Sequence, residues 1–125
     1  MQLFDTHAHY NDEKFNEDRE EVLQAIYDSG VTKLVNAGYS LESSKKALEI
    51  ANNYDWMYVI CGISPNDIPD NKEKIDKEIL ELEQLILSNI TRKNTLQDVN
   101  SVENNTENSM RTVIKNKKIV AIGEI

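Results

Sequence analysis

The sequence is poor in the residues that disulfide scaffolds and basic nucleic-acid-binding surfaces require. Its 125 residues include one cysteine, and 14 lysines and arginines stand against 22 aspartates and glutamates. The single cysteine, Cys61, cannot form an internal disulfide and suits a reducing compartment. A net charge of −8 argues against a surface that neutralises many phosphates. A nuclease is not excluded, because bound metal ions can meet a phosphate at the site itself.

Long apolar runs are also absent. No stretch approaches the roughly 20 residues of a membrane-spanning helix. The first ten residues, MQLFDTHAHY, lack the basic and apolar regions of a secretory signal. We therefore expect a cytoplasmic protein without a membrane partner. The length suffices for one domain with a hydrophobic core, and we expect residues 1–125 to belong to a single domain.

The sequence does contain short apolar segments that alternate with amphipathic ones. They predict strands and helices in turn. Buried strands are expected at 2–5, 56–62 and 119–122, and a further strand at 32–37. Helices are expected at about 17–29, after a cap at Ser40, and at about 71–87. Asn16 and Gly30 are expected to delimit the first helix. This alternation implies a parallel sheet with right-handed crossovers. An open doubly wound sheet and part of a (β/α)₈ barrel both fit it.

One segment differs in character from the rest. Residues 88–109 are rich in asparagine and serine and hold few large apolar side chains. This composition predicts a flexible polar insertion between the third helix and the fourth strand. A short helix is expected after it, at 110–116.

The main chemical signal follows the first apolar segment. His7 and His9 are the only histidines in the chain, and Asp5 precedes them. Residues i and i+2 of an extended segment point the same way, so both imidazoles can reach one metal ion. Asp5 is either a further ligand or an acceptor that orients an imidazole. Placement at the carboxyl end of a strand, where barrel active sites lie, favours a metal site over two surface histidines.

Two further signals follow later strands. Glu124 comes just after the fourth apolar segment, where a carboxylate would face the same end of the sheet and can bridge two metal ions. Ser64 and Asn66 lie in the turn after the third strand and can donate hydrogen bonds to a phosphate oxygen. Taken alone, each pattern fits an ordinary surface glutamate or a plain connecting turn better than a functional site.

Together these segments resemble the TatD family of metal-dependent deoxyribonucleases. Residues 4–10 (FDTHAHY) are similar to its opening D-T-H-x-H signature, and residues 120–125 (VAIGEI) look like its A-I-G-E-I segment. Residues 62–65 (GISP) align with its G-x-H-P turn. The resemblance implies the N-terminal half of a (β/α)₈ TIM-barrel-like metal-dependent hydrolase, with four parallel strands and intervening helices. A full barrel needs about 250 residues, so a truncated chain is expected.

The resemblance also implies roles for the site residues. His7 and His9 would bind one divalent ion, and Glu124 would bridge it to a second and act in catalysis. The substrate class would be DNA, hydrolysed at its phosphodiester bonds with two metal ions. The motifs do not distinguish Mg²⁺, Zn²⁺ and Mn²⁺. The chain departs from the family at Ser64, where the turn has a histidine, and at Asn66, where a second histidine often stands.

Several alternatives stay open. The family takes further ligands from later strands, so a complete two-metal centre is not expected from residues 1–125 alone. The chain can be part of a working nuclease, an inactive remnant, or a non-enzymatic α/β module completed by a partner chain. Amidohydrolases and PHP phosphoesterases also open with H-x-H, but the G-E-I segment favours the TatD reading. Open sheet edges would in addition permit self-association.

Overall fold

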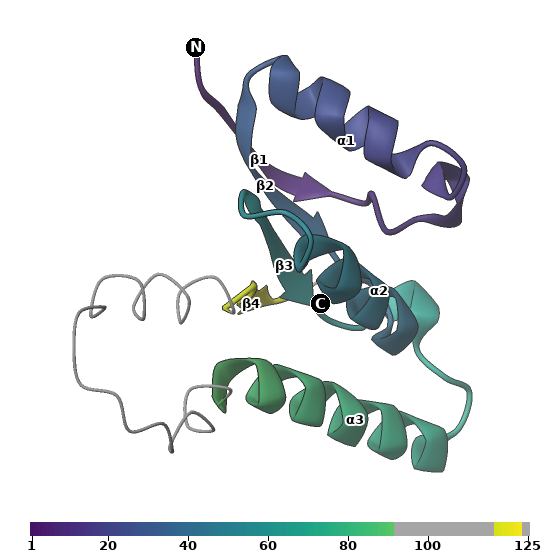
Figure 1. Ribbon diagram of the computed structural model, residues 1–125. Coiled ribbons are helices and arrows are strands. Elements are labelled where there is room, and N and C mark those ends of the chain that lie inside the picture. The colour runs from purple at the N-terminus through teal and green to yellow at the C-terminus, as the bar shows by residue number, and fades with distance from the viewer. Residues whose placement is uncertain (92–116, 124–125) are drawn as a thin grey trace, which may run out of the picture.

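The computed structural model describes residues 1–91 and 117–123 and shows strands alternating with helices (Figure 1). The elements are β1 (Leu3–Ala8), the 3₁₀ turn η1 (Glu13–Phe15), α1 (Arg19–Asp28), β2 (Val31–Ala37), α2 (Leu41–Ala51), β3 (Met57–Cys61), the 3₁₀ turn η2 (Pro65–Asp67), α3 (Lys72–Thr91) and β4 (Ile119–Ile122). This order confirms the predicted β-α-β-α-β-α-β alternation.

The described strands form one parallel sheet in the order β1-β2-β3-β4. Each strand therefore lies beside the one that precedes it in the chain, and every crossover moves in the same direction. A doubly wound sheet reverses that direction at a switch point, whereas a (β/α)₈ barrel does not. The sheet order thus decides between the two predicted architectures and agrees with part of a TIM-barrel-like fold.

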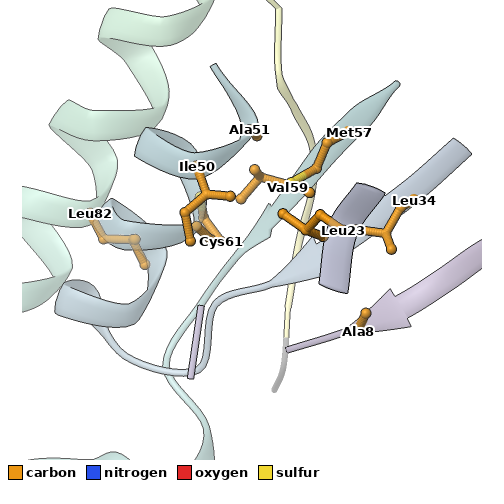
Figure 2. Close-up of a cluster of buried hydrophobic side chains, with 10 residues drawn as sticks. Ala8, Leu23, Leu34, Ile50, Ala51, Met57, Val59, Cys61 and Leu82 are labelled. Atoms are coloured by element: carbon orange, nitrogen blue, oxygen red, sulfur yellow. The ribbon is translucent and has the colours of Figure 1, made fainter. Parts of the chain in front are cut away.

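The helices all cover the same face of the sheet. One contiguous cluster of buried side chains contains Leu23 of α1, Ile50 of α2 and Leu82 of α3 (Figure 2). These side chains meet alternate residues of the central strands: Leu34 on β2, and Met57, Val59 and Cys61 on β3. Removing each large apolar side chain from water contributes roughly 1.5–3 kcal/mol, so this face supplies most of the core. The intervening residues of β3 point to the opposite face and are only partly buried.

Both edge strands are less buried than the sequence suggests. Residues 2–5 and 119–122 were predicted as buried strands, yet Phe4 is 57% exposed and Ile122 is 63% exposed. The strands themselves are present. The prediction of burial is wrong because β1 and β4 each have only one neighbouring strand among the described residues. Their outward-facing apolar side chains therefore lie open.

Helix boundaries also differ from the expectation. α1 begins at Arg19, and Asn16 ends the turn η1 and accepts a hydrogen bond from the Arg19 guanidinium. α3 continues to Thr91, so the predicted insertion cannot start at residue 88. Asn89, which looked like part of that insertion, is buried, and its Oδ1 accepts from the backbone N–H of Ile119 at 3.2 Å. Residues 92–109 and the helix expected at 110–116 lie outside the described residues.

A close backbone contact fixes α2 against the end of β2. Gly38 follows β2, and a Cβ built on it would lie 2.3 Å from Ser44 Oγ and 2.6 Å from Ser44 Cα. Contacts this short involve backbone as well as side chain, so rotation of Ser44 cannot relieve them. Glycine at position 38 lets α2 approach the sheet at the edge where the candidate site lies.

We expect Gly38→Ala to destabilise the fold by about 1–3 kcal/mol, the usual range for forced overpacking. Urea unfolding followed by circular dichroism measures this loss. Gly123→Ala is the matched control, because a Cβ there would lie 3.2 Å from the flexible Ile60 Cγ2 and needs only a small adjustment. Equal stability of the two variants would contradict the proposed contact.

Candidate metal centre

A local irregularity in β1 decides where the two histidines point. The pairing runs from Asp5 opposite Leu34 to Ala8 opposite Asn36, so β1 holds one residue more than β2 over this stretch. Such a bulge reverses the phase of the alternating side chains. Ala8 consequently joins the buried core, and His7 and His9 on either side of it project from the other face.

Asp5 stabilises this bulge. Its Oδ1 accepts a hydrogen bond from the backbone N–H of His7 at 3.1 Å. The carboxylate thus satisfies a donor at the point where regular pairing is interrupted. The predicted roles of Asp5, ligand or acceptor for an imidazole, are not tested by this backbone contact and stay predictions. The strand also runs through Ala8, three residues beyond the predicted end, so His7 lies inside β1 rather than after it.

The two imidazoles converge on each other. His7 Nε2 and His9 Nε2 are 3.1 Å apart, and the ring centroids are 4.9 Å apart. Two nitrogens bound to one Zn²⁺ at about 2.0–2.1 Å, with ligand angles between octahedral and tetrahedral, lie roughly 2.9–3.4 Å from each other. The observed separation falls within that interval. The distance between the two Nε2 atoms therefore matches that expected of two ligands on one divalent ion.

The orientation of His9 is set by β2. Its Nδ1 lies 2.9 Å from the carbonyl oxygen of Ala37, 28 positions along the chain. Because a carbonyl can only accept, Nδ1 carries the proton of a neutral ring and the lone pair lies on Nε2, which faces His7. Metal-binding histidines commonly have this arrangement, with the distal nitrogen donating to a carbonyl. The ring of Tyr39 packs edge-on against His9, with centroids 5.7 Å apart.

The predicted third ligand is not part of the described structure. Glu124 lies outside the described residues, so its ligand, bridging and catalytic roles stay predictions. Within residues 1–91 and 117–123, no three histidine, cysteine, aspartate or glutamate side chains gather closely enough to hold a metal ion. The described site therefore consists of His7 and His9 and the groups that orient them.

The turn after β3 reaches the same edge of the sheet. Ser64 is buried; its backbone N–H donates to the Tyr39 carbonyl at 2.7 Å, and its hydroxyl donates to the Asp67 carboxylate at 2.5 Å. Asn66 is exposed. The Ser64 hydroxyl proton is thus engaged by Asp67 of η2, so donation to a phosphate would compete with this bond. Binding of substrate by Ser64 and Asn66 stays a prediction.

A cavity of about 560 Å³ lies beside Tyr39 and the start of α2. Glutamates outnumber lysines among its charged lining residues, which are Glu13, Glu42, Lys45, Lys46 and Glu49. Lys45 is paired with Glu81, and Lys46 with Glu49. The cavity therefore does not favour a phosphate.

Cys61 is buried at the end of β3, as the sequence suggested. Burial raises the pKa of its thiol to about 11, although a hydrogen bond with Ser44 partly opposes the rise. The thiolate is the nucleophilic form, so at neutral pH this cysteine is inert. The chemistry of the site accordingly rests on the histidines.

Sequence reasoning missed the contribution of the residues that close β2. Asn36, Ala37 and Tyr39 all contact the segment that carries His9 or follows it. The available signal was Asn36, an amide inside an otherwise apolar strand. Such a residue needs a partner, but the sequence does not reveal which one.

Comparison with known proteins gives consistent matches. A family model described as TatD related DNase matches residues 4–125. Over 72 residues the chain is 36% identical to the uncharacterized metal-dependent hydrolase YabD of Bacillus subtilis. Over 80 residues it is 28% identical to the 3'-5' ssDNA/RNA exonuclease TatD of Escherichia coli. It is also 38% identical over 48 residues to a metal-dependent hydrolase of Geobacillus stearothermophilus, encoded in the metS 3' region.

The matches cover different shares of each protein. The Bacillus match spans 58% of this chain and 28% of the relative, and the Escherichia match spans 64% and 31%. The Geobacillus match spans 38% of this chain and 98% of the relative. The chain thus aligns with less than a third of the two longer relatives.

No helix among the described residues has the length and apolarity needed to cross a membrane.

We expect native Cys61 to resist alkylation by iodoacetamide at pH 8, three units below its pKa of about 11. Unfolding in denaturant should restore the reactivity of an ordinary thiol, with a pKa near 8.5. Mass spectrometry of both samples measures the modified fraction. Rapid labelling of the folded protein would contradict the burial of this side chain.

Proposed function

The chain belongs to the TatD related DNase family, and on this premise we propose that it acts as a divalent-metal-dependent hydrolase of phosphodiester bonds in DNA. The observation that carries the proposal is the 3.1 Å approach of His7 Nε2 to His9 Nε2, with the Nδ1 proton of His9 held by the Ala37 carbonyl. The His9 lone pair faces His7 Nε2, and a metal ion would take the place of the proton shared between the two nitrogens. The names of the relatives, metal-dependent hydrolase and 3'-5' ssDNA/RNA exonuclease, agree with it.

The proposed division of roles follows from the donor set. His7 and His9 hold one divalent ion, and Glu124 extends the site toward a second. When bound, such ions lower the pKa of water and neutralise charge on the phosphate. Asp5 keeps His7 in place through the bulge, and Ala37 keeps the lone pair of His9 directed toward the shared position. Ser64 and Asn66 are proposed to contact a phosphate oxygen from the neighbouring turn.

The acidic net charge of the chain supports a mode of nucleic-acid binding that relies on the metal centre. The chain carries a net charge of −8, so a broad basic surface is not available to hold nucleic acid. Binding then depends on contacts near the scissile phosphate, which suits a short substrate segment such as a strand end. The proposal includes three further points: the substrate is DNA rather than RNA, the site holds two metal ions rather than one, and the protein is cytoplasmic.

A second candidate, assembly with another chain, rests on the exposed edge strands. Apolar side chains gather on these strands: Leu3 and Phe4 on β1, and Val120 and Ile122 on β4. Unpaired strand edges bearing apolar residues invite pairing with another chain. We therefore also propose that the chain self-associates through these edges.

We expect His7→Ala to abolish Zn²⁺ binding in isothermal titration calorimetry. Its effect should exceed the roughly 10–100-fold loss typical when a residue behind a ligand is changed. Gln24→Ala, on the exposed face of α1, is the matched control. Unchanged affinity of the His7 variant would contradict the site.

Cleavage of end-labelled single-stranded DNA and RNA, assayed with Mg²⁺, Mn²⁺ and Zn²⁺, tests the reaction itself. Cleavage of DNA that chelator and His7→Ala both remove supports the proposal. Metal binding without cleavage by any of these ions would instead favour the inactive remnant.

We expect concentration-dependent self-association in sedimentation velocity, and we expect Val120→Lys to weaken it by placing a charge on the open edge. Ile68→Lys is the matched control, because Ile68 is 52% exposed, close to the 55% of Val120, but lies outside the sheet. Equal effects of the two variants would point to general surface hydrophobicity. A monomer at all concentrations would overturn this second proposal.

A further inference from the structure

Asn36 is a buried polar side chain for which stability alone offers no reason. It lies near the end of β2, is 0% exposed, and shares its face of the sheet with Leu34 and Val59. Its Nδ2 has no hydrogen-bond partner among the described residues. A buried unsatisfied donor costs about 1–3 kcal/mol, which an aliphatic side chain at this position would avoid. Groups of this kind call for an explanation other than packing.

The oxygen of the same amide has a defined partner. Asn36 Oδ1 accepts a hydrogen bond from the backbone N–H of Tyr10 at 2.8 Å. Ala8, the last residue of β1, lies opposite Asn36, so regular backbone pairing between the two strands ends there. The Asn36 side chain thus extends the attachment of the first segment to β2 by two residues beyond the strand.

The residue held between these attachments is His9. Ala8 is fixed by the sheet before it, and Tyr10 is fixed after it by Asn36 at its N–H and by Arg19 Nε at its carbonyl, 2.6 Å away. Ala37, the neighbour of Asn36, accepts the Nδ1 proton of His9. Two consecutive residues of β2 therefore hold two consecutive residues of the first segment. Asn36 binds the backbone of Tyr10, and Ala37 binds the imidazole of His9.

We propose that Asn36 is a positioning residue that fixes the backbone after His9, so that the imidazole keeps its proton on Nδ1 and its lone pair toward His7. This inference rests on the proposed metal-binding role of the two histidines for its effect on affinity. Its effect on the imidazole itself is independent of any metal. Release of the Tyr10 N–H loosens the peptide that sets the distance from His9 Nδ1 to the Ala37 carbonyl.

The experiment replaces Asn36 by leucine, which keeps the volume and removes the acceptor. Asn36→Ala serves as the second variant if the leucine does not fold. The first measurement is the ¹⁵N chemical shifts of the His9 imidazole in metal-free protein, which report on which nitrogen carries the proton. The second is the affinity for Zn²⁺ by calorimetry. We expect the Nδ1–H population to fall and the affinity to drop about 10–100-fold, as for other residues behind a metal ligand.

Val59→Ala is the matched control, because Val59 lies opposite Asn36 on the same face and is equally buried. It should lower the melting temperature yet leave the tautomer and the affinity unchanged. Asn36 variants with the wild-type tautomer and affinity would overturn the inference while leaving the proposed function intact. A third outcome separates the two claims: the wild-type protein binds no Zn²⁺, and the Asn36 variants have a smaller Nδ1–H population than the wild type. That result would support the inference and refute the proposed function.

Discussion

The parallel pairing of β1 with β2 is the interaction on which the candidate site depends. Because both strands run in the same direction, their carboxyl ends meet at one edge, and residues 28 positions apart come within hydrogen-bond distance. The Ala37 carbonyl can then orient His9. The turn after β3 arrives at the same edge, where Ser64 donates to the Tyr39 carbonyl. Without the parallel arrangement, none of these contacts would form.

The bulge in β1 changes which side chains of that strand face the helices. Before the bulge, Asp5 follows the phase of Leu34 and faces the helix-covered side; after it, Ala8 takes that side and the histidines take the other. An uninterrupted strand would turn His7 toward the helices. The Asp5 carboxylate satisfies the His7 N–H at the interruption, so a polar residue in an apolar strand has a structural reason.

Much of the fold could be predicted from the sequence, because local periodicity carries it. The alternation of elements, the cap at Ser40 and the buried central strand β3 all follow from patterns within one element. The predictions that failed, the ends of β1 and α3, depend on contacts between residues far apart in the sequence. β1 continues through polar residues because β2 pairs with it, and α3 continues to Thr91 with Asn89 bound to the start of β4. Likewise, the convergence of His7 and His9 followed from their spacing, whereas the contributions of Asn36 and Tyr39 required the neighbouring strand.

The proposed site brings positive charge to one place in a chain that is acidic overall, and the Ala37 carbonyl and the Asn36 amide prepare that place. The two lysines that line the cavity beside Tyr39 are paired with glutamates, so under the proposed function a bound cation, rather than these side chains, supplies the positive charge that meets a phosphate. A cation site made of two neutral imidazoles adds no negative charge of its own, but it needs rings held in one tautomer. The carbonyl of Ala37 and the amide of Asn36 meet that need at the cost of one unsatisfied buried donor. Under this proposal, the sheet gives up some stability at this edge so that a single imidazole keeps its orientation.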